Sequence, residues 1–286
     1  PDIGAISFVG STAIGKYIYS RGCAAGKRVQ ALCGAKNHMI IMPDADMDQA
    51  VDAAMGAAYG SAGERCMAVS AVLAVGDETG DRFVEALAPK VRALKIGQYD
   101  EPGVEMGPVI TAQSKDRILS YIDQGEADGA SVVVDGRGLS LQGYENGFFV
   151  GGTLLDHVTP TMSVYRDEIF GPVLSVLRPK TYEEAVNLVI SHEYGNGTAI
   201  FTRDGDAARE FACNVNVGMV GVNVPIPVPV AYHSFGGWKA SMFGDHSIHG
   251  MEGVRFYTKL KTVTARWPSG IKDGAVFNFH SGSETK

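Results

Sequence analysis

The sequence lacks the cysteine and histidine patterns that hold metal ions or disulfide frameworks. No CxxC pair occurs, and the seven histidines form no HxxxH pair. Structural and catalytic zinc sites depend on such spacing, so we expect no metal site. The few cysteines are widely separated, which is typical of a protein with reduced thiols. The four are Cys23, Cys33, Cys66 and Cys213.

An excess of basic charge and long apolar runs are also missing. The chain has 25 Lys and Arg against 32 Asp and Glu, a formal net charge of −7. Because nucleic-acid binding depends on neutralising phosphates, we expect no nucleic-acid partner. No run reaches the roughly 18 apolar residues of a membrane span, and the start, PDIGAISFVG, has no signal-peptide pattern. We therefore expect no membrane partner and a cytoplasmic location, with the mitochondrial matrix as the alternative.

What the sequence has is a regular alternation of apolar runs and amphipathic segments. This alternation predicts an α/β fold with an open, mostly parallel sheet flanked by helices. Asp46, followed three residues later by Gln49, predicts the N-cap of the second helix. The expected strands are residues 5–9, 29–32, 39–42, 68–76, 131–136, 147–155, 197–202 and 217–223. The expected helices are residues 15–21, 47–59, 81–94, 114–130, 181–195 and 206–216.

The two ends of the chain differ in character. Residues 5–21 predict a strand, a Gly-Ser turn and a helix, which is half of a nucleotide-binding unit. No strand precedes them, so we expect an upstream portion to be missing. Residues 257–267, YTKLKTVTARW, alternate in polarity and predict an isolated strand. The polar stretch 268–286 predicts a loosely ordered tail.

Six motifs occur in a fixed order along the chain: SFVGSTAIG, CGAKN, GERC, EIFGPVL, YGNGTAIFT and KLKTVTARW. This ordered set resembles the C-terminal part of the aldehyde dehydrogenase superfamily, up to about Trp267. The forms CGAKNH and GSAGERCMA are most similar to its CoA-acylating branch, the methylmalonate-semialdehyde dehydrogenases. The resemblance implies NAD-dependent oxidation of methylmalonate or malonate semialdehyde to propionyl-CoA or acetyl-CoA, with loss of CO2. It places the reaction in valine and inositol catabolism. It does not decide whether the cofactor is NAD or NADP.

The resemblance also implies a division of the chain. It implies a homo-oligomer, dimer or tetramer, assembled through the strand near Trp267. The implied parts are residues 1–34 as the end of a Rossmann-like NAD-binding domain, residues 35–234 as the catalytic domain, residues 235–254 as a return to the NAD-binding domain, residues 255–267 as an oligomerisation strand and residues 268–286 as a tail.

Cys66 matches the nucleophile of the superfamily. A thiolate adds to an aldehyde, and loss of hydride to the cofactor then leaves a thioester, which is easily displaced. Arg65, next to it, implies a bidentate contact with a substrate carboxylate. Without the resemblance, a buried inert cysteine and a surface arginine are the ordinary interpretations.

Six further residues are implied as cofactor contacts. Ser11, after Gly10, begins a helix, and helix N-termini bind phosphate groups. Glu168 and Phe170 imply a contact with ribose hydroxyls and a wall beside the nicotinamide. An ordinary N-cap, a turn glutamate and a core phenylalanine remain the alternatives. The last two, Cys33 and Gly34, imply backbone lining of the cofactor cleft; a disulfide of Cys33 with Cys66 stays a further alternative.

One departure from the common pattern bears on the product. Hydrolytic aldehyde dehydrogenases carry a glutamate as general base where this chain has Leu32. Leucine cannot take a proton, so the thioester is expected to wait for the thiolate of coenzyme A. The alternatives are a hydrolytic enzyme with another base such as Glu64, a cysteine hydrolase of the papain type, and a truncated, non-catalytic fragment or structural subunit. His38 and His233 are weaker candidates for a base, since lone histidines are usually structural.

Overall fold

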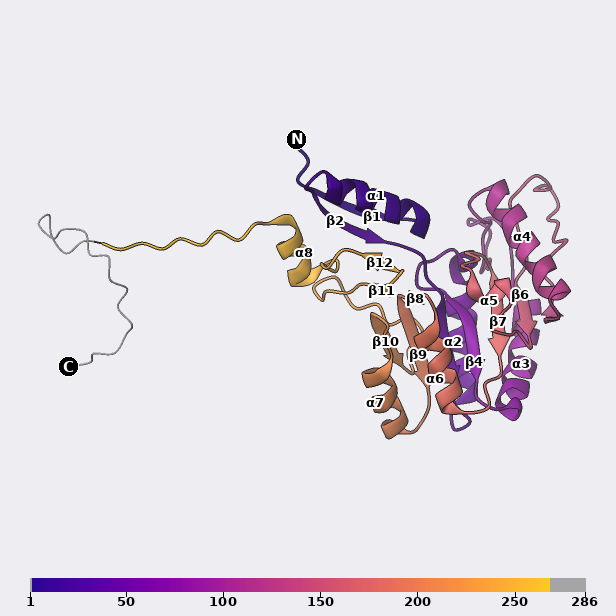
Figure 1. Ribbon diagram of the computed structural model, residues 1–286. Coiled ribbons are helices and arrows are strands. Elements are labelled where there is room, and N and C mark those ends of the chain that lie inside the picture. Colours follow the sequence, from indigo (N-terminus) through magenta and orange to yellow (C-terminus); the bar gives the residue numbers. More distant parts are fainter. Residues whose placement is uncertain (1, 268–286) are drawn as a thin grey trace, which may run out of the picture.

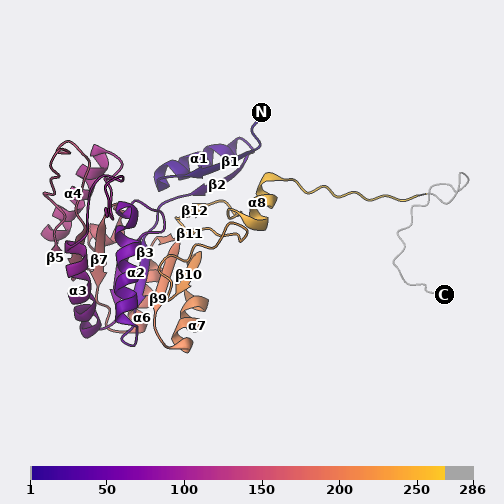
Figure 2. The same cartoon turned by 180° about the vertical axis from the view of Figure 1, so that it is seen from behind.

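The computed structural model describes residues 2–267 and contains two main sheets of different size (Figures 1 and 2). All pairs within the larger sheet are parallel except the edge pair β5–β6. The predicted α/β fold with a mostly parallel sheet is therefore confirmed. In spatial order, the larger sheet consists of β10 (Met219–Val222), β9 (Gly197–Phe201), β3 (Asn37–Ile41), β4 (Val69–Ala74), β7 (Val173–Leu177), β6 (Thr153–Asp156) and β5 (Ser131–Val134).

Helices cover both faces of the larger sheet. In both views the pair α2 and α3 lies on one face and α6 on the other (Figures 1 and 2). Strands with helices on both faces are expected to be continuously apolar, and every residue of β3, β7 and β9 is buried. The helices connecting the strands of the larger sheet are α2 (Met47–Tyr59), α3 (Asp77–Arg92), α4 (Ala112–Ala127), α5 (Ser163–Arg166), α6 (Tyr182–Ser191) and α7 (Gly205–Asn214).

The smaller sheet has the order β1-β2-β12, with β1 (Ala5–Val9) and β2 (Arg28–Leu32) parallel and β12 (Met242–Phe243) antiparallel. Helix α1 (Thr12–Ala24) connects β1 to β2 and begins directly after the Gly-Ser turn. A two-stranded ribbon, β8 (Tyr194–Gly195) with β11 (Trp238–Lys239), belongs to the link between the two sheets. The assignment of the smaller sheet to a NAD-binding domain stays a prediction.

The end of the described chain differs from the expected strand. Residues up to Tyr257 form a helix, α8 (Gly250–Tyr257), in which Phe256 is buried. Residues 258–267 have no strand partner within residues 2–267 and run as an exposed arm (Figure 1). The expectation of a strand is therefore wrong for 255–257, because Phe256 is buried and the helix continues through it. An oligomerisation role for 258–267 stays a prediction, and the expected tail, 268–286, lies outside the described residues.

The described residues contain neither a membrane-spanning helix nor a group of metal-binding side chains. Among residues 2–267, no helix is long and apolar enough to cross a membrane. In the same residues, no three His, Cys, Asp or Glu side chains are grouped so that they could hold a metal ion.

Candidate active site

Cys66 lies in a tight loop between α2 and β4. After α2 the chain makes a 3-10 turn, η1 (Gly60–Gly63), in which Ser61 and Ala62 have left-handed φ values of 54° and 53°. Residues with a Cβ adopt this conformation only at a cost, and such strain collects at functional sites. A backbone turn then follows, in which the amide of Ala68 donates to the carbonyl of Arg65 at 2.9 Å. The Cys66 thiol is free and its residue is exposed.

A single cavity of about 260 Å³ collects six of the eight residues implied as site residues. It lies where β1 and β2 end, which is the edge at which open α/β sheets bind ligands. Cys66, on the loop before a strand of the larger sheet, lines the same cavity as the strand ends of the smaller sheet. The lining residues are Val9, Gly10, Ser11, Cys33, Cys66, Arg117, Glu168 and Phe170.

The N-terminus of α1 fits a phosphate group. Ser11 is its N-cap, but its hydroxyl makes no capping bond, so it is available to a ligand. Unpaired amides and the helix dipole favour an anion at such a helix start. Gly10 is needed because a Cβ there would lie 2.5 Å from the Phe8 ring. Similarly, a Cβ on Gly15 would lie 2.2 Å from the Cys33 sulfur, so the Cys33 thiol packs under α1.

Glu168 is fixed at one oxygen and available at the other. Oε1 accepts from the amide of Ala35 at 3.0 Å, and no hydrogen bond to Oε2 occurs within residues 2–267. Burial raises the pKa of Glu168, while the Ala35 amide and the Lys36 charge act in the opposite direction. A free carboxylate oxygen beside the cavity is suited to accept from ribose hydroxyls. Gly34 leaves room for it, since a Cβ there would lie 3.0 Å from Oε2.

The Glu168 turn is held by the link between β2 and β3. The Lys36 ammonium donates to the carbonyls of Val164 at 2.7 Å and Asp167 at 2.9 Å. Lys36 is fully buried, and desolvation lowers its pKa to about 7. Phe170 has a φ of 54°, which directs the chain sharply into β7. This turn also contacts the nucleophile loop, because Gly63 packs directly on the backbone that follows Phe170.

The two residues before Cys66 differ in position: Arg65 lines a cavity together with Cys66, whereas Glu64 does not. Arg65 is exposed and lines a narrower cavity together with Cys66, Glu168 and Phe170. Glu64 is not among the residues lining either cavity; its Oε2 accepts from the amide of Ile110 at 3.0 Å and its Oε1 is buried. Burial raises the pKa of Glu64. Geometry therefore does not favour Glu64 as the base of a hydrolytic reaction.

The histidine candidates lie away from the cavity. His38 is buried in β3, with Nε2 3.1 Å from the hydroxyl of Tyr165, and desolvation lowers its pKa well below the usual value. His233 is exposed in the loop before β11 and lines neither cavity. Neither residue is placed to act on a group bound at Cys66.

Some residues at the site were not expected from the sequence. Arg117, on α4, lines the larger cavity, and two carboxamides, Asn37 and Asn196, donate to the Cys66 carbonyl at 2.9 and 3.0 Å. No local pattern marks an asparagine whose partner lies far along the chain. The motifs CGAKN, which contains Asn37, and YGNGTAIFT, which contains Asn196, were the only signals.

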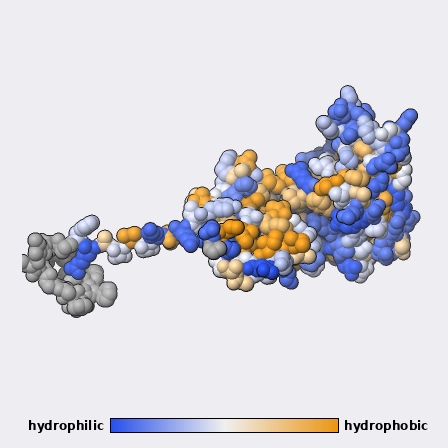
Figure 3. Space-filling view, turned by 90° about the horizontal axis from the view of Figure 1, so that it is seen from above, coloured by the Kyte–Doolittle hydropathy of each residue, from blue (hydrophilic) through white to orange (hydrophobic). Residues whose placement is uncertain are grey.

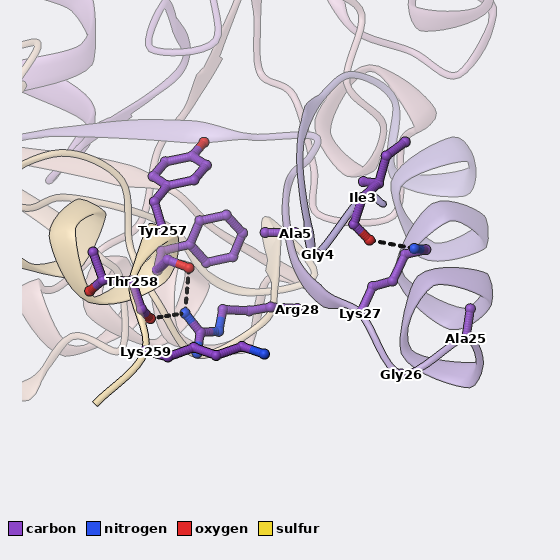
Figure 4. Close-up of a pocket in the computed structure, with 11 residues that line it drawn as sticks. Ile3, Gly4, Ala5, Ala25, Gly26, Lys27, Arg28, Tyr257, Thr258 and Lys259 are labelled. Carbon is purple, nitrogen blue, oxygen red and sulfur yellow. Dashed lines mark hydrogen bonds between the residues drawn. The ribbon is translucent and has the colours of Figure 1, made fainter. Parts of the chain in front are cut away.

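A cavity of about 840 Å³, larger than the one at Cys66, lies elsewhere, between the start of β1 and α8 (Figure 4). Two of its three cations are engaged: Lys27 donates to the carbonyl of Ile3, and Arg28 donates to the carbonyls of Phe256 and Thr258, while Lys259 is the third. It contains none of the predicted site residues. The predicted site residues gather instead at the smaller cavity beside Cys66.

The comparisons with known proteins identify the family of the chain. The Aldehyde dehydrogenase family matches residues 1–263. The chain is 60% identical to malonate-semialdehyde dehydrogenase of Pseudomonas aeruginosa over 94% of this chain and 54% of that protein. It is 49% identical to bovine mitochondrial methylmalonate-semialdehyde/malonate-semialdehyde dehydrogenase [acylating], over 93% of this chain and 49% of that protein.

A solved structure gives the same picture. A protein from Sinorhizobium meliloti, complexed with NAD and provisionally named methylmalonate-semialdehyde dehydrogenase, superposes with a TM-score of 0.94 at 62% identity. The match covers 96% of this chain and 56% of that one. The chain thus spans about half the length of the relatives that it matches. With a family match over nearly its whole length, the chain belongs to the aldehyde dehydrogenase family.

Proposed function

We propose that this chain carries the catalytic cysteine of a NAD-dependent, CoA-acylating semialdehyde dehydrogenase. The substrate is methylmalonate or malonate semialdehyde, and the products are propionyl-CoA or acetyl-CoA and CO2. The observation that carries the proposal is the cavity that joins Cys66 to Ser11 and Glu168. The names of the similar proteins, several of them semialdehyde dehydrogenases and some called acylating, support the same reaction.

Each residue has a task in the oxidation step. The Cys66 thiolate adds to the aldehyde carbon, and the tetrahedral adduct collapses to a thioester when hydride leaves. NAD, when bound, supplies the hydride acceptor. Ser11 and the start of α1 hold its pyrophosphate, and Glu168 holds a ribose. Phe170 closes the cavity beside Cys66 and excludes water from the reacting atoms.

The acyl group leaves with coenzyme A because neither expected position of a water-activating base, Leu32 or Glu64, supplies one, and the Glu168 carboxylate in the cavity holds the ribose. Leu32, at the end of β2, has no proton acceptor where hydrolytic relatives keep a glutamate. Glu64, two residues before Cys66, accepts from the Ile110 amide and lines neither cavity. The CoA thiolate therefore attacks the thioester carbonyl and Cys66 leaves as its own thiolate.

Arg65 selects the substrate by its carboxylate. It lines the narrower cavity next to Cys66 and is exposed, so its planar guanidinium is free to form two parallel hydrogen bonds with a carboxylate. The carboxylate leaves as CO2 when its bond to the α-carbon breaks, and the thioester enolate that remains takes a proton from solvent to give the propionyl or acetyl group. The proposal further places the enzyme in the cytoplasm or mitochondrial matrix, acting as a homo-oligomer.

The deacylation step provides the test. Without CoA, the complete enzyme is expected to form NADH as a burst of one equivalent per Cys66, followed by slow turnover. CoA is expected to speed the steady state and yield an acyl-CoA. Leu32→Glu is expected to raise the CoA-independent rate, since general-base assistance is worth about 10²–10⁴-fold. Stopped-flow NADH absorbance and mass analysis of the product check both points.

Two outcomes would overturn the proposal in different ways. Fast CoA-independent turnover to the free acid would make the enzyme hydrolytic. A Cys66→Ala variant that keeps more than a few per cent of the wild-type rate would remove the nucleophile assignment.

Arg65→Lys separates charge from geometry. Lysine keeps the positive charge but loses the planar fork, so KM for malonate semialdehyde is expected to rise far more than KM for propanal. Steady-state kinetics with both aldehydes measure the difference. A similar rise for both would show that Arg65 does not contact the carboxylate.

A further inference from the structure

The carbonyl of Cys66 has an unusual environment within its turn. The turn is closed by the Ala68 amide, which donates to Arg65, and this bond leaves the Cys66 carbonyl without a backbone partner. Two side-chain carboxamides supply the missing bonds: Nδ2 of Asn37 at 2.9 Å and Nδ2 of Asn196 at 3.0 Å. The central peptide of the turn, between Cys66 and Met67, is therefore held from outside.

Asn37 is fully used by this arrangement. Its side chain is 4% exposed, and its Nδ2 donates a second bond, to the carbonyl of Ala68 at 2.9 Å. Its Oδ1 accepts from the amide of Gly197 at 3.0 Å. The orientation of the carboxamide follows from these partners, because the reverse orientation would place its oxygen against two carbonyls. Asn37 thus joins the start of β3 to both the nucleophile turn and the start of β9.

The central peptide is the part of a turn that moves most easily. The two common turn types differ by rotation of this peptide, which changes ψ of the residue before it. In this turn that residue is Cys66, so rotation would redirect the carbonyl and alter the position of the thiol relative to the cavity. Two donors on one carbonyl oppose this rotation.

We propose that Asn37, assisted by Asn196, is a positioning residue that holds the Cys66–Met67 peptide in the orientation required for attack. It acts through the Cys66 carbonyl, since its own carboxamide is occupied by backbone groups. The inference rests on the proposed role of Cys66 as nucleophile. It also explains why Asn37 follows Lys36: neighbouring residues of one extended segment point in opposite directions, and Lys36 holds the Glu168 turn while Asn37 holds the Cys66 turn.

The test uses Asn37→Asp in the complete enzyme. The carboxylate keeps the size of the side chain and the bond from Gly197 but loses both donors, so the single-turnover rate of NADH formation at saturating aldehyde is expected to fall about tenfold or more. The dissociation constant of NAD is expected to stay unchanged. The ratio of variant to wild-type rate should rise as the pH falls, because a protonated carboxyl regains one donor.

The matched control is Asn223→Asp. Asn223 forms the same kind of bonds with a backbone, accepting from the Thr202 amide and donating to the Thr202 carbonyl, both at 3.0 Å. This substitution is expected to lower the melting temperature but leave the single-turnover rate per titrated Cys66 unchanged. Asn196→Asp is expected to give a smaller loss of single-turnover rate than Asn37→Asp. The fold-loss in the double variant is expected to be smaller than the product of the two single fold-losses, because both residues act on one carbonyl.

Each result decides the inference. Asn37→Asp with the same rate as Asn223→Asp would overturn it. If Asn37→Asp does not fold, Asn196→Asp decides, and a wild-type rate in that variant would overturn it. If the wild-type enzyme forms no NADH, or Cys66→Ala remains active, the proposed function fails instead, so the two failures are distinguishable.

Discussion

The two sheets of this chain are buried to very different degrees. In the larger sheet, all five residues of β3, of β7 and of β9 are buried. In the smaller sheet, no residue of β1 is fully buried, and the only buried residues of α1 are two glycines. Apolar side chains gather instead on the exposed surface over α1 and β1, among them Val9 and Ile14 (Figure 3). Most of the folding free energy of the chain must therefore come from the larger sheet.

The site combines the two regions. The larger sheet holds Cys66 and Glu168 on segments that are cross-linked by buried hydrogen bonds from Lys36 and Asn37. The smaller sheet contributes Ser11 at the exposed start of a helix. A nucleophile needs a fixed position, whereas a group that binds a ligand phosphate needs an accessible one. This difference suggests three experiments, from the largest expected effect to the smallest.

Truncating a core side chain in each sheet gives the largest contrast. Phe201→Ala in β9 removes a side chain that is 0% exposed, and we expect a loss of about 3–5 kcal/mol in the free energy of unfolding. Val9→Ala in β1 changes a side chain that is 71% exposed, and we expect a change within about 0.5 kcal/mol. Urea unfolding measures both. Similar losses in the two variants would mean that the smaller sheet contributes as much stability as the larger one.

Much of this organisation could be predicted from local patterns. The bounds of β1 and α2 follow from an apolar run and from the Asp46 cap, whose side chain accepts from the Gln49 amide as expected. Strand β7 was not predicted, because Gly171 and Pro172 before it indicate a turn and mask the apolar run that follows. Helix α8 was not predicted because GMEGVRFY has glycines at its start and inside.

The site could be predicted only where motif and chemistry coincide. Cys66, Ser11 and Glu168 stand in motifs, and the structure places all three on one cavity. Asn196 also stands in a motif, YGNGTAIFT, but the motif indicated no role for it, since its partner is 130 residues away in sequence and its residue type is common in turns. Long-range hydrogen bonds depend on the fold and leave no local periodicity.

A buried histidine pair makes the larger sheet sensitive to acid. His38 and His192 pack against Tyr165, and both pKa values are lowered by burial and by the charges of Lys36 and Lys239, that of His192 to about 4. Unfolded histidine titrates near 6.5, so the unfolded chain binds more protons below that pH. The contribution of the two histidines to stability is expected to be constant above about pH 6.5 and to fall by roughly 1.4 kcal/mol per pH unit for each histidine between about 6.5 and 4.

His192→Gln isolates this contribution. Glutamine does not titrate. The fall in unfolding free energy between about pH 6.5 and 4 is therefore expected to become less steep by about 1.4 kcal/mol per pH unit, which corresponds to one proton per molecule. Urea unfolding at several pH values measures the slope. Most carboxylates titrate near or below pH 4, so they contribute little to the upper part of this range. An unchanged slope would show that His192 is protonated in the folded protein.

The smallest effect compares the helix caps of the two regions. Thr181 caps α6, and its side chain accepts from the Glu184 amide at 3.2 Å, so Thr181→Ala is expected to cost about 1 kcal/mol of stability. Ser11 caps α1 but its hydroxyl makes no capping bond, so Ser11→Ala is expected to leave the unfolding free energy nearly unchanged.

The hydroxyl of Ser11 is instead expected to matter for the cofactor, because it lines the cavity at the helix start. In the complete enzyme, Ser11→Ala should therefore raise the dissociation constant of NAD, by about tenfold for one lost hydrogen bond to a charged phosphate. Fluorescence titration of NAD and urea unfolding of both variants separate the two roles. A loss of stability in Ser11→Ala with unchanged NAD affinity would make Ser11 an ordinary cap and would remove the distinction between a sheet built for stability and one that presents its strand ends to a ligand.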